Sequence, residues 1–188
     1  MAQAVVAFRV VASQWGAPAD AVDGAYADLV DRYSEPHRHY HTLEHIGEVL
    51  ERVQGTEVEL AAWYHDVIYD TTTSDSEARS AAYASDVLAR LRAPTDVIAE
   101  VQRLILLTAG HSVEPGDVSG RMLIDADLAI LTADRARYER YARDVRAEYA
   151  HVDDESWRAG RTAVLERLRS VVSDDANIVW DLGTLSAP

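Results

Sequence analysis

The stretch Leu60-Ala-Ala-Trp-Tyr-His-Asp-Val-Ile-Tyr69 decides the fold, because on a helix it is apolar on nearly every side. A helix of that kind is typical of the centre of a helical bundle. His65 and Asp66 lie in its middle, and burying an unpaired carboxylate is costly. Asp66 therefore needs a strong partner. A cation is the simplest one, and an arginine or a set of helix N–H groups is the alternative.

The rest of the chain repeats the helical pattern. Apolar residues recur at three- and four-residue spacing along nearly all of the 188 residues, and alternating strand-like runs are missing. The pattern predicts an all-α fold, a compact bundle of many helices. Two pairs, Thr56 with Glu59 and Ser74 with Glu77, predict capping boxes at helix starts. We expect helices at 4–14, 19–33, 42–53, 57–69, 75–91, 96–108, 121–131, 133–150, 155–172 and 176–182.

Composition limits both domain organisation and function. No linker or repeat interrupts the chain, so we expect a single domain over 1–188, with the C-terminal helices of 133–188 packing on it. Acidic residues outnumber basic ones by 32 to 18, for a net charge of -14, which disfavours bulk nucleic acid and anionic membranes as partners. Cysteine and lysine are both absent, which excludes thiol nucleophiles, thiolate metal sites and lysine Schiff bases. No apolar run approaches the roughly 18 residues that cross a bilayer, and we expect a cytoplasmic protein.

Two further segments offer metal-ligating side chains. His41 and His45 are four residues apart, a spacing that places both on one side of a helix, although such pairs also occur by chance in a histidine-rich window. In 121–131, Asp127 falls inside the apolar stripe, whereas Asp125 projects to the other side. Asp127 is therefore the acid that we expect to face inward, and a buried pair with an arginine is the alternative.

Taken in order, three of these motifs resemble those of the HD-domain superfamily of metal-dependent phosphohydrolases. They are Tyr40-His-Thr-Leu-Glu-His45, His65-Asp66 and Ala126-Asp127-Leu128. The elements 38–45, 63–70 and 77–81 are similar to those of one small single-domain HD branch, and the likeness continues through 141–168. The resemblance implies an HD-type bundle around a buried metal site. Its implied ligands are His45, His65, Asp66 and Asp127.

The implied ligand set has consequences for the cofactor and the reaction. Two imidazoles and two carboxylates suit Mn, Fe, Co, Ni or Zn, and Mg less well because it prefers oxygen. Water activated by such an ion hydrolyses phosphoesters, so the resemblance implies a hydrolase acting on a small phosphorylated metabolite or nucleotide. His111 resembles the extra histidine of two-metal HD proteins, so a second metal ion is allowed and His111 is a candidate at the substrate.

The remaining site predictions concern proton transfer and substrate binding. The resemblance implies that His41 is the general acid, with a solvent-facing or supporting histidine as the alternative, and counts Asp66 in the catalytic machinery. Arg38 is a candidate bidentate donor to phosphate, unless it is an ordinary surface arginine. We also expect Arg146 and Tyr149 to contact substrate, and Arg161 is a further candidate there; solvated helix faces are the alternative.

Two other functions fit the same residues. Some HD relatives hold two irons and oxidise a C–H bond with dioxygen, so an HD-type di-iron oxygenase is one alternative for this protein. A noncatalytic metabolite-binding domain that retains the metal is the other. The oligomeric state is open, and a homodimer is one option.

Overall fold

Helices make up all the regular structure of the computed structural model, which describes residues 2–186, with side chains from Phe8 onward. No strand occurs in that part of the chain, which confirms the all-α prediction. The chain divides into two compact units, with the boundary between Ala126 and Asp127. The predicted packing of 133–188 on the same domain stays a prediction.

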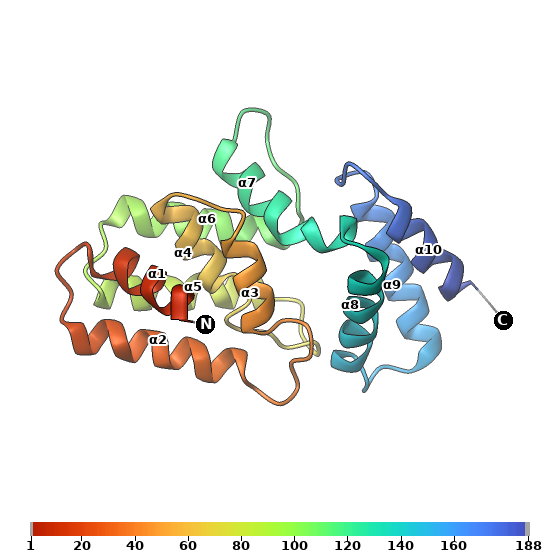
Figure 1. Ribbon diagram of the computed structural model, residues 1–188, viewed down its shortest axis with the longest axis horizontal. Coiled ribbons are helices and arrows are strands. Elements are labelled where there is room, and N and C mark those ends of the chain that lie inside the picture. The colour runs from red at the N-terminus through yellow and green to blue at the C-terminus, as the bar shows by residue number, and fades with distance from the viewer. Residues whose placement is uncertain (1, 187–188) are drawn as a thin grey trace. The chain divides into compact units, whose positions relative to one another are not determined.

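The described residues of the first unit form seven helices (Figure 1). They are α1 (Ala2–Ser13), α2 (Ala19–Tyr33), α3 (Leu43–Leu50), α4 (Thr56–Tyr64), α5 (Ser76–Arg90), α6 (Thr95–Thr108) and α7 (Val118–Asp127), the last of which ends at the boundary. The second unit holds the 3₁₀ helix η1 (Leu128–Thr132), α8 (Arg135–Glu148), α9 (Asp154–Leu168) and α10 (Ala176–Leu185). None of the helices within 2–186 combines the length and the apolar character that a bilayer crossing requires.

The centre of the first unit is α4, as the sequence predicted. Every residue from Leu60 to Tyr64 is buried, and α4 contacts α1, α3, α5 and α6. Trp63 packs edge-on against Phe8 and Tyr26, with ring centroids 5.5 and 5.9 Å apart. Because this core surrounds α4 on all sides, the C-terminal end of α4 has a defined position in the unit.

That end comes earlier than predicted, because α4 stops at Tyr64 and does not continue to Tyr69. The last four carbonyls of an α-helix need partners from outside the regular helix. Here the partners come from the following turn and from α2: His65 N–H donates to Ala61 O, the His65 ring to Ala62 O, the Tyr33 hydroxyl to Trp63 O and Val67 N–H to Tyr64 O. His65 and Asp66 therefore lie in a turn at the helix end and not in mid-helix.

Other helix ends also differ from the prediction. Helix α3 begins at Leu43, because the Thr42 side chain caps it by accepting from Glu44 N–H at 3.3 Å. His41 thus precedes the helix, and the predicted helical pairing of His41 with His45 is wrong. In the predicted range 121–131, the α-helix gives way to a 3₁₀ helix directly after Asp127.

Both predicted capping boxes are wrong. Glu59 does accept a backbone N–H at the start of α4, but from Gly55 at 3.1 Å, because Gly55 and not Thr56 is the N-cap. Helix α5 starts at Ser76 after the N-cap Asp75, which makes no side-chain capping bond.

The second unit has a polar centre. Arg161 on α9 is buried and pairs with Asp181 on α10 at 2.9 Å. Its guanidinium also donates to the Tyr141 hydroxyl at 3.0 Å, and the Tyr138 hydroxyl donates to Asp181 at 2.9 Å. These bonds join α8, α9 and α10 and satisfy a charge pair that would otherwise be costly to bury.

We expect Gly120→Ala to destabilise the first unit by about 1–3 kcal/mol, since it overpacks the contact of α7 with α6. An added Cβ would lie 2.4 Å from Asp117 Oδ2 and 2.8 Å from Leu107 Cδ1. Asp117 has little freedom to move, because it caps Gly120 N–H at 2.9 Å and pairs with Arg103 at 2.6 Å.

The control for this substitution is Gly24→Ala on α2, where a Cβ meets nothing within 4 Å. It should stabilise the protein by about 0.5–1 kcal/mol, because alanine restricts the unfolded chain. Urea denaturation measures both variants. Equal effects of the two substitutions would contradict the close approach of α7 to α6.

Candidate metal centre

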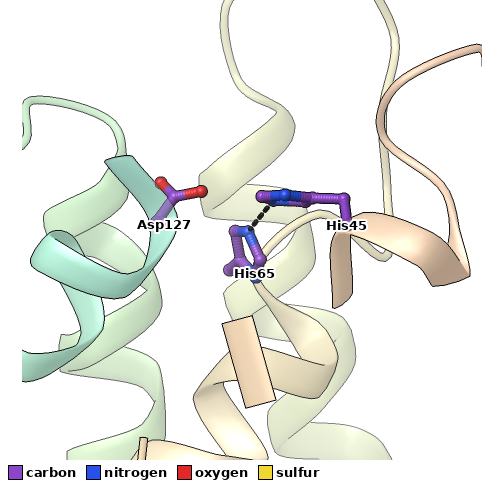
Figure 2. A group of neighbouring side chains, drawn as sticks. All are labelled: His45, His65 and Asp127. Carbon is purple, nitrogen blue, oxygen red and sulfur yellow. Dashed lines mark hydrogen bonds between the residues drawn. The ribbon is translucent and has the colours of Figure 1, made fainter. Parts of the chain in front are cut away.

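Three side chains from separate segments of the chain bring ligand atoms to one place. A nitrogen of His45, a nitrogen of His65 and a carboxylate oxygen of Asp127 all lie within 4.8 Å of one another (Figure 2). His45 belongs to α3, His65 follows the last residue of α4, and Asp127 is the last residue of α7. The two histidines are buried and Asp127 is half-buried. The three residues form a cluster that could hold a metal ion.

Asp66 lies against the same histidines. Its Oδ2 is 3.1 Å from His65 Nε2 and 3.6 Å from His45 Nε2, and the two Nε2 atoms are 3.3 Å apart. Metal–nitrogen and metal–oxygen bonds of about 2.0–2.2 Å place ligands of one ion roughly 3–4.3 Å apart. All three distances fall in that range, so Asp66 can share an ion with the two histidines, but it is not part of the three-residue group whose ligand atoms all lie within 4.8 Å of one another.

The protonation of His65 also fits a cation. Its Nδ1 lies 3.0 Å from Ala62 O, which only accepts, so Nδ1 carries the proton of the ring. In the neutral imidazole, Nε2 then presents a lone pair to the Asp66 carboxylate. Two electron-rich atoms at that distance repel each other unless a proton or a cation lies between them. The Ala62 carbonyl thus orients His65 as a metal ligand in the way that supporting groups usually do.

Electrostatics at Asp66 favour its charged form. Burial acts to raise the pKa of Asp66, but the positive charges that His65, His41 and His45 carry when they are protonated, and the hydrogen bond that a protonated His65 donates, outweigh it and hold the pKa below its ordinary value. An ionised carboxylate beside two imidazoles is the donor set that a divalent transition metal binds.

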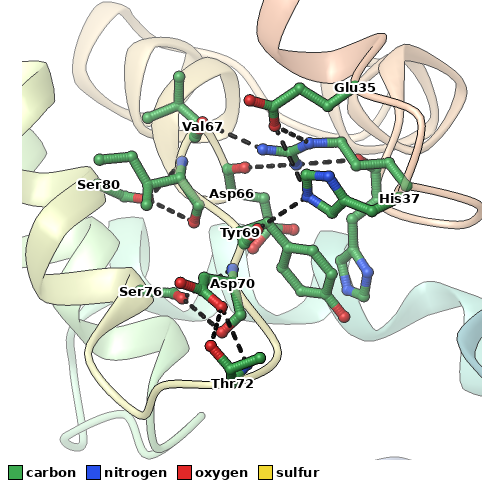
Figure 3. A network of polar contacts seen from close by, with 12 residues as sticks. Glu35, His37, Asp66, Val67, Tyr69, Asp70, Thr72, Ser76 and Ser80 are labelled. Atoms are coloured by element: carbon green, nitrogen blue, oxygen red, sulfur yellow. Dashed lines mark hydrogen bonds and ion pairs between the residues drawn. The ribbon is translucent and has the colours of Figure 1, made fainter. Parts of the chain in front are cut away.

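The turn that carries His65 and Asp66 is held by hydrogen bonds from two other segments (Figure 3). Arg38 donates to Asp66 O at 2.8 Å and to Val67 O at 3.1 Å. On α5, the Ser80 hydroxyl accepts from Ile68 N–H at 3.0 Å and donates to Ile68 O at 3.2 Å. These bonds replace the helical bonds that end at Tyr64, so the turn has few other conformations open to it.

His41, the predicted general acid, lies beside this cluster. Its ring stacks on Tyr69, with centroids 4.1 Å apart and planes inclined by 27°. The His41 ring also approaches the His45 ring edge-on, at 5.9 Å between centroids. The two histidines are therefore neighbours, although no helix holds His41.

Arg38 is not the surface arginine that the sequence left as an alternative. Its side chain is fully buried, and it also donates to Glu35 Oε2 at 3.0 Å and to His41 O at 3.1 Å. Four of the five N–H donors of its guanidinium are used in these bonds and in those to the turn. Its predicted contact with a phosphate stays a prediction.

The other predicted substrate residues take structural positions. His111 follows α6 with a φ of 53°, and its N–H donates to Leu107 O at 2.8 Å; it is not among the clustered ligands of the described residues. Arg146 closes the turn between α8 and α9 by donating to Tyr149 O, Val152 O and Asp154. Their substrate contacts stay predictions, as do those of Tyr149 and of the buried Arg161.

Asp125 and Asp127 separate as the helical pattern predicted. The Asp125 side chain is 59% exposed and pairs with Arg121 at 3.5 Å, one turn back on α7. Asp127 instead joins the cluster with the two histidines.

Sequence reasoning missed three supporting residues. Tyr33 donates to the end of α4, Tyr69 stacks on His41, and Ser80 binds the turn at Ile68. Ser80 had a signal, since it belongs to the element 77–81. Tyr69 had the same kind of signal, since it belongs to the element 63–70, whereas Tyr33 gave none, because a core tyrosine has the same pattern as a tyrosine at a site.

Comparisons with known proteins add no identification: no protein family, curated protein or solved structure matches this chain.

We expect Mn²⁺, Co²⁺ or Zn²⁺ to raise the melting temperature of the protein, because an ion that binds only the folded state stabilises it by about 2.7 kcal/mol at a hundredfold excess over Kd. Asp127→Asn should remove most of this shift. Asp125→Asn is the matched control and should keep it, because Asp125 is exposed outside the cluster. His65→Ala and the exposed His151→Ala form a second pair. Equal metal shifts within either pair, measured by differential scanning calorimetry, would contradict the assigned ligands.

Proposed function

We propose that this protein is a metal-dependent phosphohydrolase of the HD type, which cleaves a small phosphoester such as a nucleotide or a related phosphometabolite. One observation carries the proposal: ligand atoms of His45, His65 and Asp127 converge, with Asp66 in contact with both histidines. These are the four residues that the ordered HD motifs supply. Convergence of residues that are so far apart in the sequence supports a shared role.

Charge balance at this cluster is compatible with an anionic substrate. The protein as a whole carries a net charge of -14, which repels phosphate. Asp66 and Asp127 together would neutralise a divalent cation, with His45 and His65 as neutral ligands. When bound, a transition metal ion of this kind supplies Lewis acidity and makes water a nucleophile near neutral pH. The local field then no longer opposes a phosphate group.

The residues in and around the cluster have separate roles in the proposed reaction. His45 and His65 present nitrogens, and the carbonyl of Ala62 holds the His65 ring in the required tautomer. His41 holds a proton for the leaving oxygen, and its stacking on Tyr69 limits the orientations of its ring. The two-iron alternative needs further ligands, and among the described residues the cluster includes no nitrogen of His111.

We expect hydrolysis of at least one member of a panel of nucleoside mono- and diphosphates, sugar phosphates and phosphodiesters in the presence of Mn²⁺, Co²⁺, Ni²⁺, Fe²⁺ or Mg²⁺. Phosphate release and product chromatography measure it. Removal of metal by a chelator, verified by elemental analysis, should abolish turnover, and adding the metal back should restore it. Full activity in verified metal-free protein would refute the proposal. Metal-dependent ligand binding with no turnover of any compound would point to a noncatalytic binding domain.

His41→Asn should lower kcat by about 10²–10⁴-fold, the usual contribution of general acid catalysis, and leave metal affinity nearly unchanged. The exposed His39→Asn, two residues earlier, is the matched control and should keep wild-type kcat. The loss in His41→Asn should be smaller for a substrate whose leaving group needs no proton, such as a nitrophenyl ester. The same loss for both kinds of substrate would exclude His41 as the acid.

A further inference from the structure

We propose that Arg38 is the positioning residue of the metal centre. Its buried guanidinium sets the segment that carries His65 and Asp66 against the segment that carries His41 and His45. This inference rests on the proposed metal site, and it assigns Arg38 a role through the ligands and not through contact with substrate.

The hydrogen bonds of Arg38 connect the two segments directly. One nitrogen, Nη1, donates to His41 O at 3.1 Å and to Asp66 O at 2.8 Å. The second, Nη2, donates to Val67 O at 3.1 Å. A single planar group therefore holds the backbone just before α3 and the backbone just after α4. His45 follows His41 by four residues, and His65 directly precedes Asp66.

The guanidinium has little room to move. Its Nε donates to Glu35 Oε2 at 3.0 Å, and the side chain has no exposed surface. The rings of Tyr33 and Tyr69 lie 5.0 and 5.6 Å from its central carbon, within the range of a cation–π contact. Both tyrosines also serve the centre, since Tyr33 donates to Trp63 O and Tyr69 stacks on His41. Arg38 thus occupies the middle of the supporting network.

The chemistry of the helix end explains why an arginine is needed. The carbonyls of Asp66 and Val67, in the turn after α4, accept hydrogen bonds from the buried Arg38 near the negative end of the helix dipole. A planar fork of N–H donors can satisfy three carbonyls and a carboxylate together. The compact ammonium group of lysine carries the same charge but cannot span them. The expected defect of a lysine substitution is therefore geometric.

A loosened turn should weaken metal binding. Replacing a group that orients metal ligands usually costs about 10–100-fold in metal affinity. We therefore expect Arg38→Lys to bind Co²⁺ about 10–100-fold more weakly than wild type, as measured by isothermal titration calorimetry at a temperature where circular dichroism shows both proteins folded. The visible spectrum of bound Co²⁺, which reports ligand geometry, should change in the same variant.

Arg161→Lys is the matched control. Arg161 is also a buried arginine with an ionic partner and tyrosine neighbours, but it lies in the second unit, where it pairs with Asp181. The Arg161→Lys variant should have a lower melting temperature than wild type but the same Co²⁺ affinity and the same Co²⁺ spectrum. Guanidinium at millimolar concentration should restore Co²⁺ affinity to Arg38→Ala by filling the vacated space, and should have no such effect on Arg161→Ala.

Each outcome decides the inference. Wild-type Co²⁺ affinity and spectrum in folded Arg38→Lys would overturn it, and so would an equal loss of affinity in Arg161→Lys.

If Arg38→Lys does not fold, Glu35→Gln replaces it as the test variant. Removing the carboxylate that holds Arg38 Nε should weaken Co²⁺ binding measurably but by less than about tenfold, and unchanged binding would overturn the inference. Wild-type protein that binds no Co²⁺ overturns this inference and the proposed function together. Co²⁺ binding without hydrolysis overturns only the proposed function, because the readout for Arg38 is affinity.

Discussion

The candidate centre depends on how the carbonyl groups at the end of α4 find hydrogen-bond partners. A buried helix cannot simply stop, because its last carbonyls must be satisfied where no bulk water reaches them. Tyr33, the His65 ring and Val67 N–H meet this need at the helix itself, and Arg38 and Ser80 meet it in the turn that follows. The same bonds that end the helix therefore place His65 and Asp66, so stability and function share one network.

Both units of the chain use a buried arginine, but for different purposes. Arg161 neutralises Asp181 and joins three helices through side chains. Arg38 bonds mainly to backbone carbonyls and orders a segment that has no regular structure of its own. Arginine suits both tasks, because it stays charged when buried and offers several donors in a fixed plane. Because the sequence contains no lysine, arginine is its only strongly basic side chain, and both buried sites use it.

Much of the fold and part of the site could be predicted from the sequence. The all-α class, the central position of 60–64 and the inward side of Asp127 follow from apolar periodicity, which reports burial directly. Helix ends were less predictable. The start of α3 and the end of α4 are fixed by a cap at Thr42 and by partners such as Tyr33, thirty residues before Trp63, and no local pattern carries that information.

By itself, the sequence determined which residues are available for chemistry: histidines, carboxylates and arginines, without cysteine or lysine, on helices of known order. Only the tertiary structure decided that Asp66 lies in a turn against two histidines, that His41 stacks on Tyr69 and that Arg38 is buried beneath them. The physical reason is that apolar periodicity in the sequence indicates which side chains are buried and which are exposed. The partner of a buried polar group is chosen by packing among segments that are distant in the chain.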